Sequence, residues 1–196
     1  MIKVGITGGI GSGKTYVSKM FEALGVPVYY ADERAKELMQ NNEELRAAII
    51  ANFGEEAYAG GSLNREFLAQ VVFQNADLLA KLNSLVHPAV AKDTEEWNKL
   101  HQDKTYTIKE AALLFETGSN KQLDKTILVH ADEEERILRV MQRDHVSKDK
   151  VMSRIQHQMK DIEKMQFADF IINNDGKREI EKMVHKIHSY FSYAMV

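Results

Sequence analysis

The segment with the clearest chemical meaning is GGIGSGKT, residues 8–15. It fits G-x-x-x-x-G-K-[ST] at every specified position, with the strand-like IKVGIT before it and a helical pattern from Tyr16 to Leu24 after it. Glycines let the backbone wrap around a phosphate with its N–H groups inward, and the following helix adds the positive end of its dipole. Lys14 then reaches the β- and γ-phosphates, and the Thr15 hydroxyl ligates Mg²⁺. The pattern predicts a nucleoside triphosphate site.

Two carboxylates stand where strands would carry them to the same sheet edge as this loop. Asp32 follows PVYYA and suits a base that takes a proton from a group about to accept phosphate. An N-cap for the next helix is an equal alternative. Glu116 ends the apolar run AALLFE, a position that suits an acid at the end of a strand. It could order a Mg²⁺ water or a substrate group, or be a solvated loop acid. Asp132 is better explained as an N-cap, with Glu135 completing a capping box.

Three arginines and one histidine complete the candidate residues. Arg136, Arg139 and Arg143 share one face of a predicted helix, where they could grip a transferred phosphoryl group. The alternative is a charged face paired with the acids at 133–135. His87 precedes Pro88, so we expect a helix break there that points the imidazole at a cleft; a capping or core role is the alternative.

Several apolar runs rich in β-branched or aromatic residues predict buried strands, and helical patterns alternate with them. This order is typical of a parallel sheet covered by helices on both faces. The predicted strands are Ile2–Thr7, Pro27–Tyr30, part of Tyr106–Leu114, Lys125–Val129 and Phe170–Ile172.

Two spacings are too long for one crossover helix, and they predict helical insertions within a single domain. The first, about 32–103, holds helical patterns at 32–52, 64–81 and 83–102 and is expected to bind the acceptor. The second, about 132–165, holds patterns at 132–144 and 147–161 and is expected to be a lid. The core is then about 1–31, 104–131 and 166–196.

Composition narrows the class of protein. The chain has 196 residues, 26 Lys and Arg against 29 Asp and Glu, and no cysteine. Disulfides and thiolate chemistry are therefore excluded, and a net charge of −3 argues against a general nucleic-acid binder. Neither a signal peptide nor a run of 18 apolar residues is present, which predicts a cytoplasmic protein without a membrane partner.

A triphosphate site does not by itself define an activity. The base-reading N-K-x-D of a GTPase is missing, because NKQLD at 120–124 places its Asp one residue too late. A small-molecule kinase is the economical interpretation, with one insertion for the acceptor and one that closes over the phosphates. Two alternatives stay open. One is a P-loop kinase that acts on a nucleoside or nucleotide, and the other is a regulatory protein that binds the nucleotide without transferring phosphate.

At this point the chain resembles the dephospho-CoA kinase family over nearly its whole length. The P-loop alone indicates only a nucleotide-binding class, whereas LNSLVHP and the ADFIINNDG ending are more specific. The matching segments are GITGGIGSGKT, A-D at 31–32, LNREFLAQVVF at 63–73, LNSLVHP at 82–88, LLFE at 113–116, RVMQRD at 139–144, RIQHQM at 154–159 and ADFIINNDG at 168–176.

The resemblance implies a P-loop kinase fold, α/β, with a five-stranded parallel sheet and helical substrate-binding and lid insertions. It implies ATP-dependent phosphorylation of the ribose 3′-hydroxyl of dephospho-CoA, the final step of coenzyme A synthesis, with ATP and Mg²⁺. The expected partner is this small molecule, and the chain is expected to be a monomer or a weak homo-oligomer without nucleic-acid partners.

The implied roles fall on numbered positions of this chain. Asp32, Lys14 and Arg139 are the expected catalytic residues, and Thr15 is the expected metal ligand. Arg143 falls on a second lid arginine. The acceptor is assigned to Asp32, Arg65, His87 and Glu116. ATP is assigned to Gly8, Gly11, Ser12, Gly13, Lys14, Thr15, Tyr16, Arg139 and Asn174.

Three positions depart from the family pattern. Tyr30 stands where the family often has a first Asp, Ala112 replaces the usual Pro before LLFE, and Arg136 stands where Gln is common. These departures concern metal placement and lid detail, while the loop and the expected base are intact.

Overall fold

The computed structural model describes residues 1–73, 75–176 and 179–193. The chain divides into two compact units, Met1–Tyr30 with His101–Val196, and Ala31–Leu100. The second unit nearly coincides with the insertion expected at 32–103, whereas the lid expected at 132–165 is not separated from the first. Residue 74 of the predicted helix 64–81, and residues 177, 178 and 194–196 of the predicted core, lie outside the described residues.

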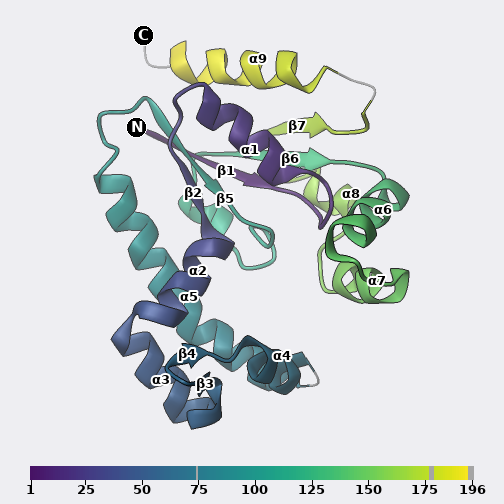
Figure 1. The fold of residues 1–196 in the computed structure, drawn as a ribbon. Coiled ribbons are helices and arrows are strands. Elements are labelled where there is room, and N and C mark those ends of the chain that lie inside the picture. The colour runs from purple at the N-terminus through teal and green to yellow at the C-terminus, as the bar shows by residue number, and fades with distance from the viewer. Residues whose placement is uncertain (74, 177–178, 194–196) are drawn as a thin grey trace. The chain divides into compact units, whose positions relative to one another are not determined.

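The first unit is built on a five-stranded sheet in the order β2-β5-β1-β6-β7. All its neighbouring strands are parallel, which confirms the predicted sheet (Figure 1). Because parallel strands end at the same edge, the loops after β1, β5 and β6 emerge together. The strands are β1 (Ile2–Thr7), β2 (Val28–Tyr30), β5 (Tyr106–Glu110), β6 (Lys125–His130) and β7 (Phe170–Asn173).

One face of this sheet is covered by α1 (Lys14–Ala23) and α9 (Ile180–Tyr193), which pack against each other. Their apolar sides and the sheet form the main core, in which Ile6, Ile108 and Phe21 are fully buried. On the other face a Cβ at Gly5 would lie about 2.5 Å from Leu123 and 2.6 Å from Leu114. The irregular segment 111–123, with the short helix η2 (Ser119–Gln122), therefore packs there in place of a long helix.

The predicted lid forms α6 (Glu133–Asp144), α7 (Lys148–Gln156) and the short α8 (Asp161–Lys164). α6 and α7 share a small core of their own around Val140 and Val151. The predicted helix 147–161 thus ends five residues early, and residues 157–160 are irregular. The predicted capping box is wrong. Asp132 occupies the N-cap of α6 without a side-chain capping bond, and Glu135 pairs with Arg139 at 2.7 Å instead.

Among the described residues of the second unit, four α-helices surround a separate apolar cluster that includes Ile49, Leu68 and Val86. The predicted helix 32–52 is two helices, because the Asn42 side chain accepts a hydrogen bond from the N–H of Leu45 and starts a new one. The elements are α2 (Ala31–Asn41), α3 (Glu43–Phe53), η1 (Glu55–Ala57), β3 (Tyr58–Ala59), β4 (Ser62–Leu63), α4 (Arg65–Phe73) and α5 (Ala76–Lys99).

The break expected at His87 is wrong, since α5 runs through Pro88 without interruption. Proline removes one backbone donor and so leaves a carbonyl one turn earlier without its partner. Ser84, His87 and Pro88 are all exposed, so water can solvate that carbonyl. Apolar residues on both sides of the proline pack into the cluster of this unit, and their burial outweighs the lost bond.

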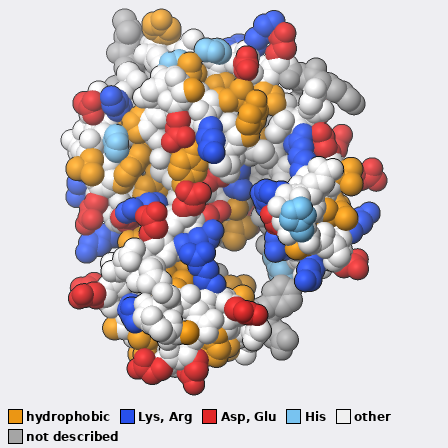
Figure 2. Space-filling model, in the orientation of Figure 1, with side chains coloured by type: hydrophobic (Ala, Val, Ile, Leu, Met, Phe, Trp, Pro, Cys, Tyr) orange, Lys and Arg blue, Asp and Glu red, His pale blue; other side chains and the backbone are white. Residues whose placement is uncertain are grey.

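None of the described helices carries an apolar stretch long enough to cross a bilayer. On the face drawn in Figure 2, acidic and basic side chains are interspersed, and neither sign forms a continuous patch. This mixing agrees with the near balance of charges in the sequence.

One polar pair closes the core between β5 and α9. The Tyr106 hydroxyl lies 2.7 Å from His188 Nδ1. Burial raises the pKa of Tyr106, so the phenol stays protonated and can donate to the imidazole. Burial, and then the nearby His185, lower the pKa of His188. The folded protein therefore favours neutral His188.

This pair predicts a pH dependence of stability. Because the pKa of folded His188 lies below its unfolded value of about 6.5, the stability it contributes is present above that pH and is lost as the pH falls. His188→Phe should flatten the decline in the free energy of unfolding between about pH 7 and 5. It should also cost about 1–2 kcal/mol at every pH by leaving the Tyr106 hydroxyl unpaired.

Urea unfolding across this pH range measures both effects. His145→Asn, at an exposed histidine with a positive φ of 53° that Asn tolerates, is the matched control. Equal slopes for the wild type and His188→Phe would contradict the prediction.

Candidate active site

The phosphate loop, residues 8–15, joins β1 to α1 at the carboxyl edge of the sheet. Gly11 and Gly13 have φ of 80° and 89°, values that a residue with a Cβ rarely adopts. The N–H of Ser12 donates to the carbonyl of Gly9 at 3.0 Å and tightens the turn. The loop is thus a compact backbone curve that ends at the first turn of α1, as the motif predicts.

Side chains from outside the loop hold its carbonyl groups. The Asn174 amide donates to the Ser12 carbonyl at 2.8 Å, and Arg139 Nη1 approaches the Gly11 carbonyl at 3.4 Å. In a trans peptide the C=O and the following N–H point in opposite directions. Fixing the Ser12 carbonyl on Asn174 therefore turns the N–H of Gly13 toward the other side, which is the side a phosphate would need.

Glycine is also required at Gly13 by close approach. A Cβ there would lie 2.1 Å from the Asn174 side-chain nitrogen. Asn174, which follows β7 and is 8% exposed, is thereby locked against the loop. Asn174, which the resemblance assigns to ATP, is thus part of the wall of the phosphate loop.

An acid that the sequence analysis missed meets the two functional side chains of the loop. Glu110, the last residue of β5, is 3% exposed. Its Oε1 accepts a hydrogen bond from the Thr15 hydroxyl at 3.1 Å and lies 3.7 Å from Lys14 Nζ. A hydroxyl and a carboxylate side by side are the oxygen ligands that suit Mg²⁺, which keeps further sites for waters and substrate phosphates.

The expected position of Glu116 at a strand end is corrected. The ladder stops where the N–H of Ala111 donates to the Ile6 carbonyl at 3.0 Å, and residues 112–118 form turns. Glu116 Oε1 instead accepts from the N–H of Met159 at 3.0 Å and lies 2.9 Å from the ammonium of Lys164, which is wholly buried. A strand-end acid does exist, but it is Glu110, and the role of Glu116 toward substrate stays a prediction.

The three arginines of α6 have different surroundings. Arg139 Nη2 donates to Glu135 at 2.7 Å and to the Asn174 carbonyl at 2.8 Å, so it joins the lid to the loop after β7. Arg143 is 63% exposed and pairs with Asp144, whose pKa Arg143 and then Arg154 lower to about 2. Arg136 is buried. Only Arg139 and Arg136 therefore reach the phosphate loop.

The other predicted site residues are exposed. Asp32 lies in the first turn of α2, Arg65 begins α4, and His87 is on α5, all within the second unit. Tyr16 on α1 is 57% exposed. Their assigned roles stay predictions.

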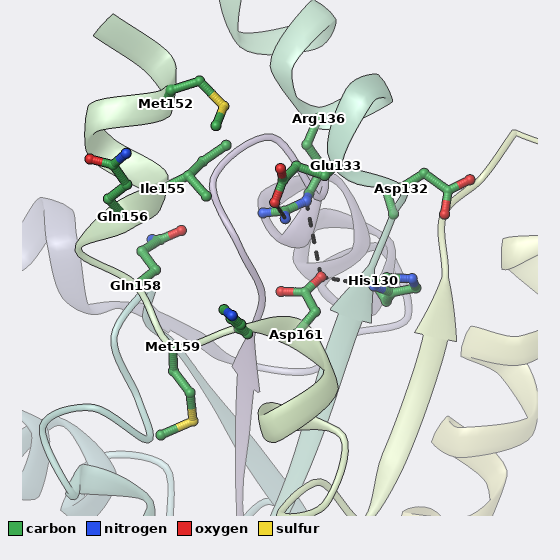
Figure 3. A pocket seen from close by; sticks show the side chains of 12 residues that line it. His130, Asp132, Glu133, Arg136, Met152, Ile155, Gln156, Gln158, Met159 and Asp161 are labelled. Atoms are coloured by element: carbon green, nitrogen blue, oxygen red, sulfur yellow. Dashed lines mark hydrogen bonds and ion pairs between the residues drawn. The ribbon is translucent and has the colours of Figure 1, made fainter. Parts of the chain in front are cut away.

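A pocket of about 500 Å³ lies beside the loop, between the end of β6 and the lid helices (Figure 3). Asp161 Oδ2 lies 2.8 Å from His130 Nδ1 on its wall. Nearby, Gln158 Oε1 accepts from the N–H of Ile10 at 2.9 Å. No sequence pattern indicated a function for these three side chains, and no spacing rule links them to a loop more than a hundred residues away.

Comparisons with known proteins agree on one family. The dephospho-CoA kinase family matches residues 2–179. A dephospho-CoA kinase of Salinibacter ruber is 45% identical over 179 residues, which are 90% of each chain. The structure of a dephospho-CoA kinase from Campylobacter jejuni is 26% identical with a TM-score of 0.72, over 99% of this chain and 98% of that one. A crystal structure from Thermus thermophilus is 35% identical with a TM-score of 0.84, over 96% of both chains.

The buried pair of Lys164 and Glu116 predicts a stability effect. Lys164→Met leaves Glu116, whose side chain is 17% exposed, without its cation, and should lower the free energy of unfolding by about 3–5 kcal/mol. Adding Glu116→Gln removes the unpaired charge and should restore part of that loss. Denaturant unfolding of both variants, with Lys150→Met at an exposed lid lysine as control, measures this. A double variant less stable than Lys164→Met would contradict the pairing.

Proposed function

The chain belongs to the dephospho-CoA kinase family, and we propose which of its residues carry the family's reaction. That reaction is the ATP-dependent phosphorylation of dephospho-CoA in coenzyme A synthesis. We propose further that the acceptor group is the ribose 3′-hydroxyl and that the products are CoA and ADP. The small molecule is the expected partner; cytoplasmic location, a monomeric or weakly associated state and the lack of nucleic-acid partners stay predictions.

The observation that carries the proposal is the meeting of Lys14, Thr15 and Glu110 at the mouth of the phosphate loop. Backbone amides of the loop bind the β- and γ-phosphates, and the ammonium of Lys14 adds positive charge beside them. Lys14 Nζ lies 3.7 Å from the acid, too far for a tight hydrogen bond, so it is free to turn toward a phosphate. Phosphoryl transfer depends mainly on such positioning and charge neutralisation.

Thr15 and Glu110 are proposed to hold Mg²⁺. When bound, the ion neutralises charge on the β- and γ-phosphate oxygens. Thr15 supplies its hydroxyl oxygen, and the buried Glu110 carboxylate holds that hydroxyl in place and balances charge. Among the described residues no cluster of three or more His, Asp or Glu could form an all-protein metal cage. This fits an ion that takes much of its coordination from substrate and water.

Asp32 is proposed as the base. Its chain position supports this, since it stands two residues after Tyr30, the parallel partner of Glu110 at the carboxyl ends of β2 and β5. In the reaction, the 3′-hydroxyl proton passes to the Asp32 carboxylate as the oxygen bonds to the γ-phosphorus. The bond from that phosphorus to the β,γ-bridging oxygen breaks, and ADP leaves with its electron pair. Lys14 and Arg139 stabilise the charge that moves to the bridging oxygen.

The remaining site residues are assigned either to ATP or to the acceptor. Asn174 and Arg139, held together by a 2.8 Å hydrogen bond, are proposed to flank ATP beyond the loop. Arg65 and His87, exposed on the helices of the second unit, are proposed to bind the acceptor together with Glu116. Tyr16, next to Thr15 in α1, is proposed to lie along the nucleotide.

An ADP-release assay with four acceptors tests the activity. Dephospho-CoA, adenosine, CMP and shikimate are each supplied with ATP and Mg²⁺. We expect turnover with dephospho-CoA alone. Turnover only with another acceptor would reject the assignment, and no turnover with any of them would favour a protein that binds nucleotide as a switch.

Glu110→Gln keeps the shape of the buried side chain but removes its charge. The Mg²⁺ concentration that gives half-maximal activity should rise about 10–100-fold, the range seen when a group that orients a metal ligand is lost. A Mg²⁺ titration at saturating ATP measures this. Asp124→Asn is the control. Asp124 accepts a hydrogen bond from the N–H of Lys3 at the opposite edge of the sheet, so this change should leave the Mg²⁺ requirement unchanged. An unaltered Mg²⁺ requirement in Glu110→Gln would remove Glu110 from the site.

Asp32→Asn should lower kcat by ~10²–10⁴-fold, the range for loss of a general base. The Kd for ATP should change little, because the phosphate loop is intact. Glu33→Gln, the neighbouring acid in the first turn of α2, is the matched control. If Asp32→Asn lowered only the melting temperature, Asp32 would be a helix-terminus residue and another group would be the base.

A further inference from the structure

Arg136 is a buried guanidinium that rests on the back of the phosphate loop. Its side chain is 6% exposed. A Cβ at Gly9 would lie 2.0 Å from its Nη1, and a Cβ at Gly11 would lie 2.4 Å from its carbonyl oxygen. The first half of the loop therefore fits directly against α6, with no room for a side chain between them.

Two carboxylates balance the charge of Arg136, and both lie near the upper limit of ion-pair distance. Asp161 Oδ2 lies 4.0 Å from its Nε, and Glu133 Oε2 lies 3.6 Å from its Nη2. Among the described residues, its Nε has no hydrogen-bond partner. Burying a cation with such loose pairing is costly, so the arrangement does not maximise stability. A neutral side chain of similar length, such as the Gln that the resemblance leads one to expect, would avoid that cost.

Asp161 is itself held in place by the fold. Its carboxylate lies 2.8 Å from His130 Nδ1 at the end of β6, and its side chain is 10% exposed. Figure 3 shows Asp161 between His130 and Arg136, with dashed lines to both. The carboxylate thus faces the guanidinium from the segment that follows α7.

The same segment contacts the loop a second time. Gln158 Oε1 accepts a hydrogen bond from the N–H of Ile10, next to Gly9. A Cβ at Gly9 would also lie 3.3 Å from Asp161 Oδ1. Residues 157–161 therefore reach Gly9 through both Arg136 and Asp161, and they reach Ile10 directly. Beside this contact lies the pocket of about 500 Å³, whose wall includes Met152, Ile155 and Met159. The Arg136 head group lines this space, so it has room to move.

We propose that Arg136 is a positioning residue for the phosphate loop. Arg136 contacts Gly9 on one side and Asp161 on the other. The position of residues 157–161 therefore sets the position of the part of the loop that precedes Gly11. Arg136 acts through the loop backbone. The inference rests on the proposed function, because it concerns how the nucleotide site is shaped.

The seat on Gly9 makes the proposal testable by steric replacement. Gly9 has no positive φ, so alanine meets no backbone strain there, and its methyl group would occupy the space of Arg136 Nη1. Because Nη1 is the end of a flexible side chain, the guanidinium would be displaced. Gly9→Ala and Arg136→Gln should therefore cause the same defect, and combining them should add little.

The experiment compares wild type, Arg136→Gln, Gly9→Ala and the double variant. We expect each single variant to raise the Kd for ADP and the KM for ATP about tenfold, equivalent to about 1.4 kcal/mol, with the KM for dephospho-CoA unchanged. The double variant should match the single variants. Asp161→Asn should shift the same constants in the same direction, and Arg136→Lys should restore part of the affinity. Arg154→Met, at an arginine on α7 that pairs with Asp144 and is 48% exposed, is the control.

The outcomes separate this proposal from a purely structural role and from the proposed function. A fall in melting temperature for Arg136→Gln with an unchanged Kd for ADP would overturn it. So would tenfold effects of Arg136→Gln and Gly9→Ala that multiply in the double variant. If Gly9→Ala does not fold, Arg136→Gln with Asp161→Asn forms the same cycle, and multiplicative effects would again overturn the proposal. Calorimetric ADP binding needs no acceptor, so it tests the positioning role even if dephospho-CoA is not phosphorylated.

Discussion

A phosphate loop works only when its backbone amides face a ligand, and in this chain that orientation is imposed from outside the loop. The Ser12 carbonyl is held by Asn174, the Gly11 carbonyl is approached by Arg139, and the Ile10 N–H is held by Gln158. All three side chains come from segments well over a hundred residues away. Because each trans peptide fixes N–H opposite C=O, these few contacts set the direction of the neighbouring amides. The shape of the loop is thus a property of the whole first unit.

Three buried or half-buried cations of the same region lie near carboxylates. Lys14 faces Glu110, Lys164 faces Glu116, and Arg136 lies between acids on two sides. In a medium of low dielectric an unpaired ion would be strongly unfavourable. The pairs differ in closeness: Lys164 lies at 2.9 Å, whereas Lys14 lies at 3.7 Å and Arg136 near 4 Å. The pair of Lys164 and Glu116 is therefore the tightest of the three.

The second unit is organised on different principles. Its helices surround their own apolar cluster, and its longest helix keeps Pro88 on the solvated side. A bidentate contact of Arg34 with Asp93, at 3.0 and 2.6 Å, ties α2 to α5 within this unit. Asp32 is therefore carried at the start of a helix that is braced along its length, close in the chain to the end of β2.

The sequence by itself determined whatever depends on neighbours along the chain. The five strands, the phosphate loop with its flanking strand and helix, and the two insertions follow from local periodicity and from glycine spacing, and the family follows from several such motifs. The sequence offered Glu116 as an acid at the end of the strand that begins at Tyr106, because the apolar run continues to that point, and left a solvated loop acid as the alternative. Only tertiary structure ended the strand at Glu110, where the ladder with β1 and β2 stops. Tertiary structure likewise placed Lys164, Asp161 and Gln158 beside their partners, and kept α5 continuous through a proline. Contacts between distant segments, and the packing that keeps a helix continuous through a proline, leave no mark at a fixed spacing, so local pattern could not have supplied them.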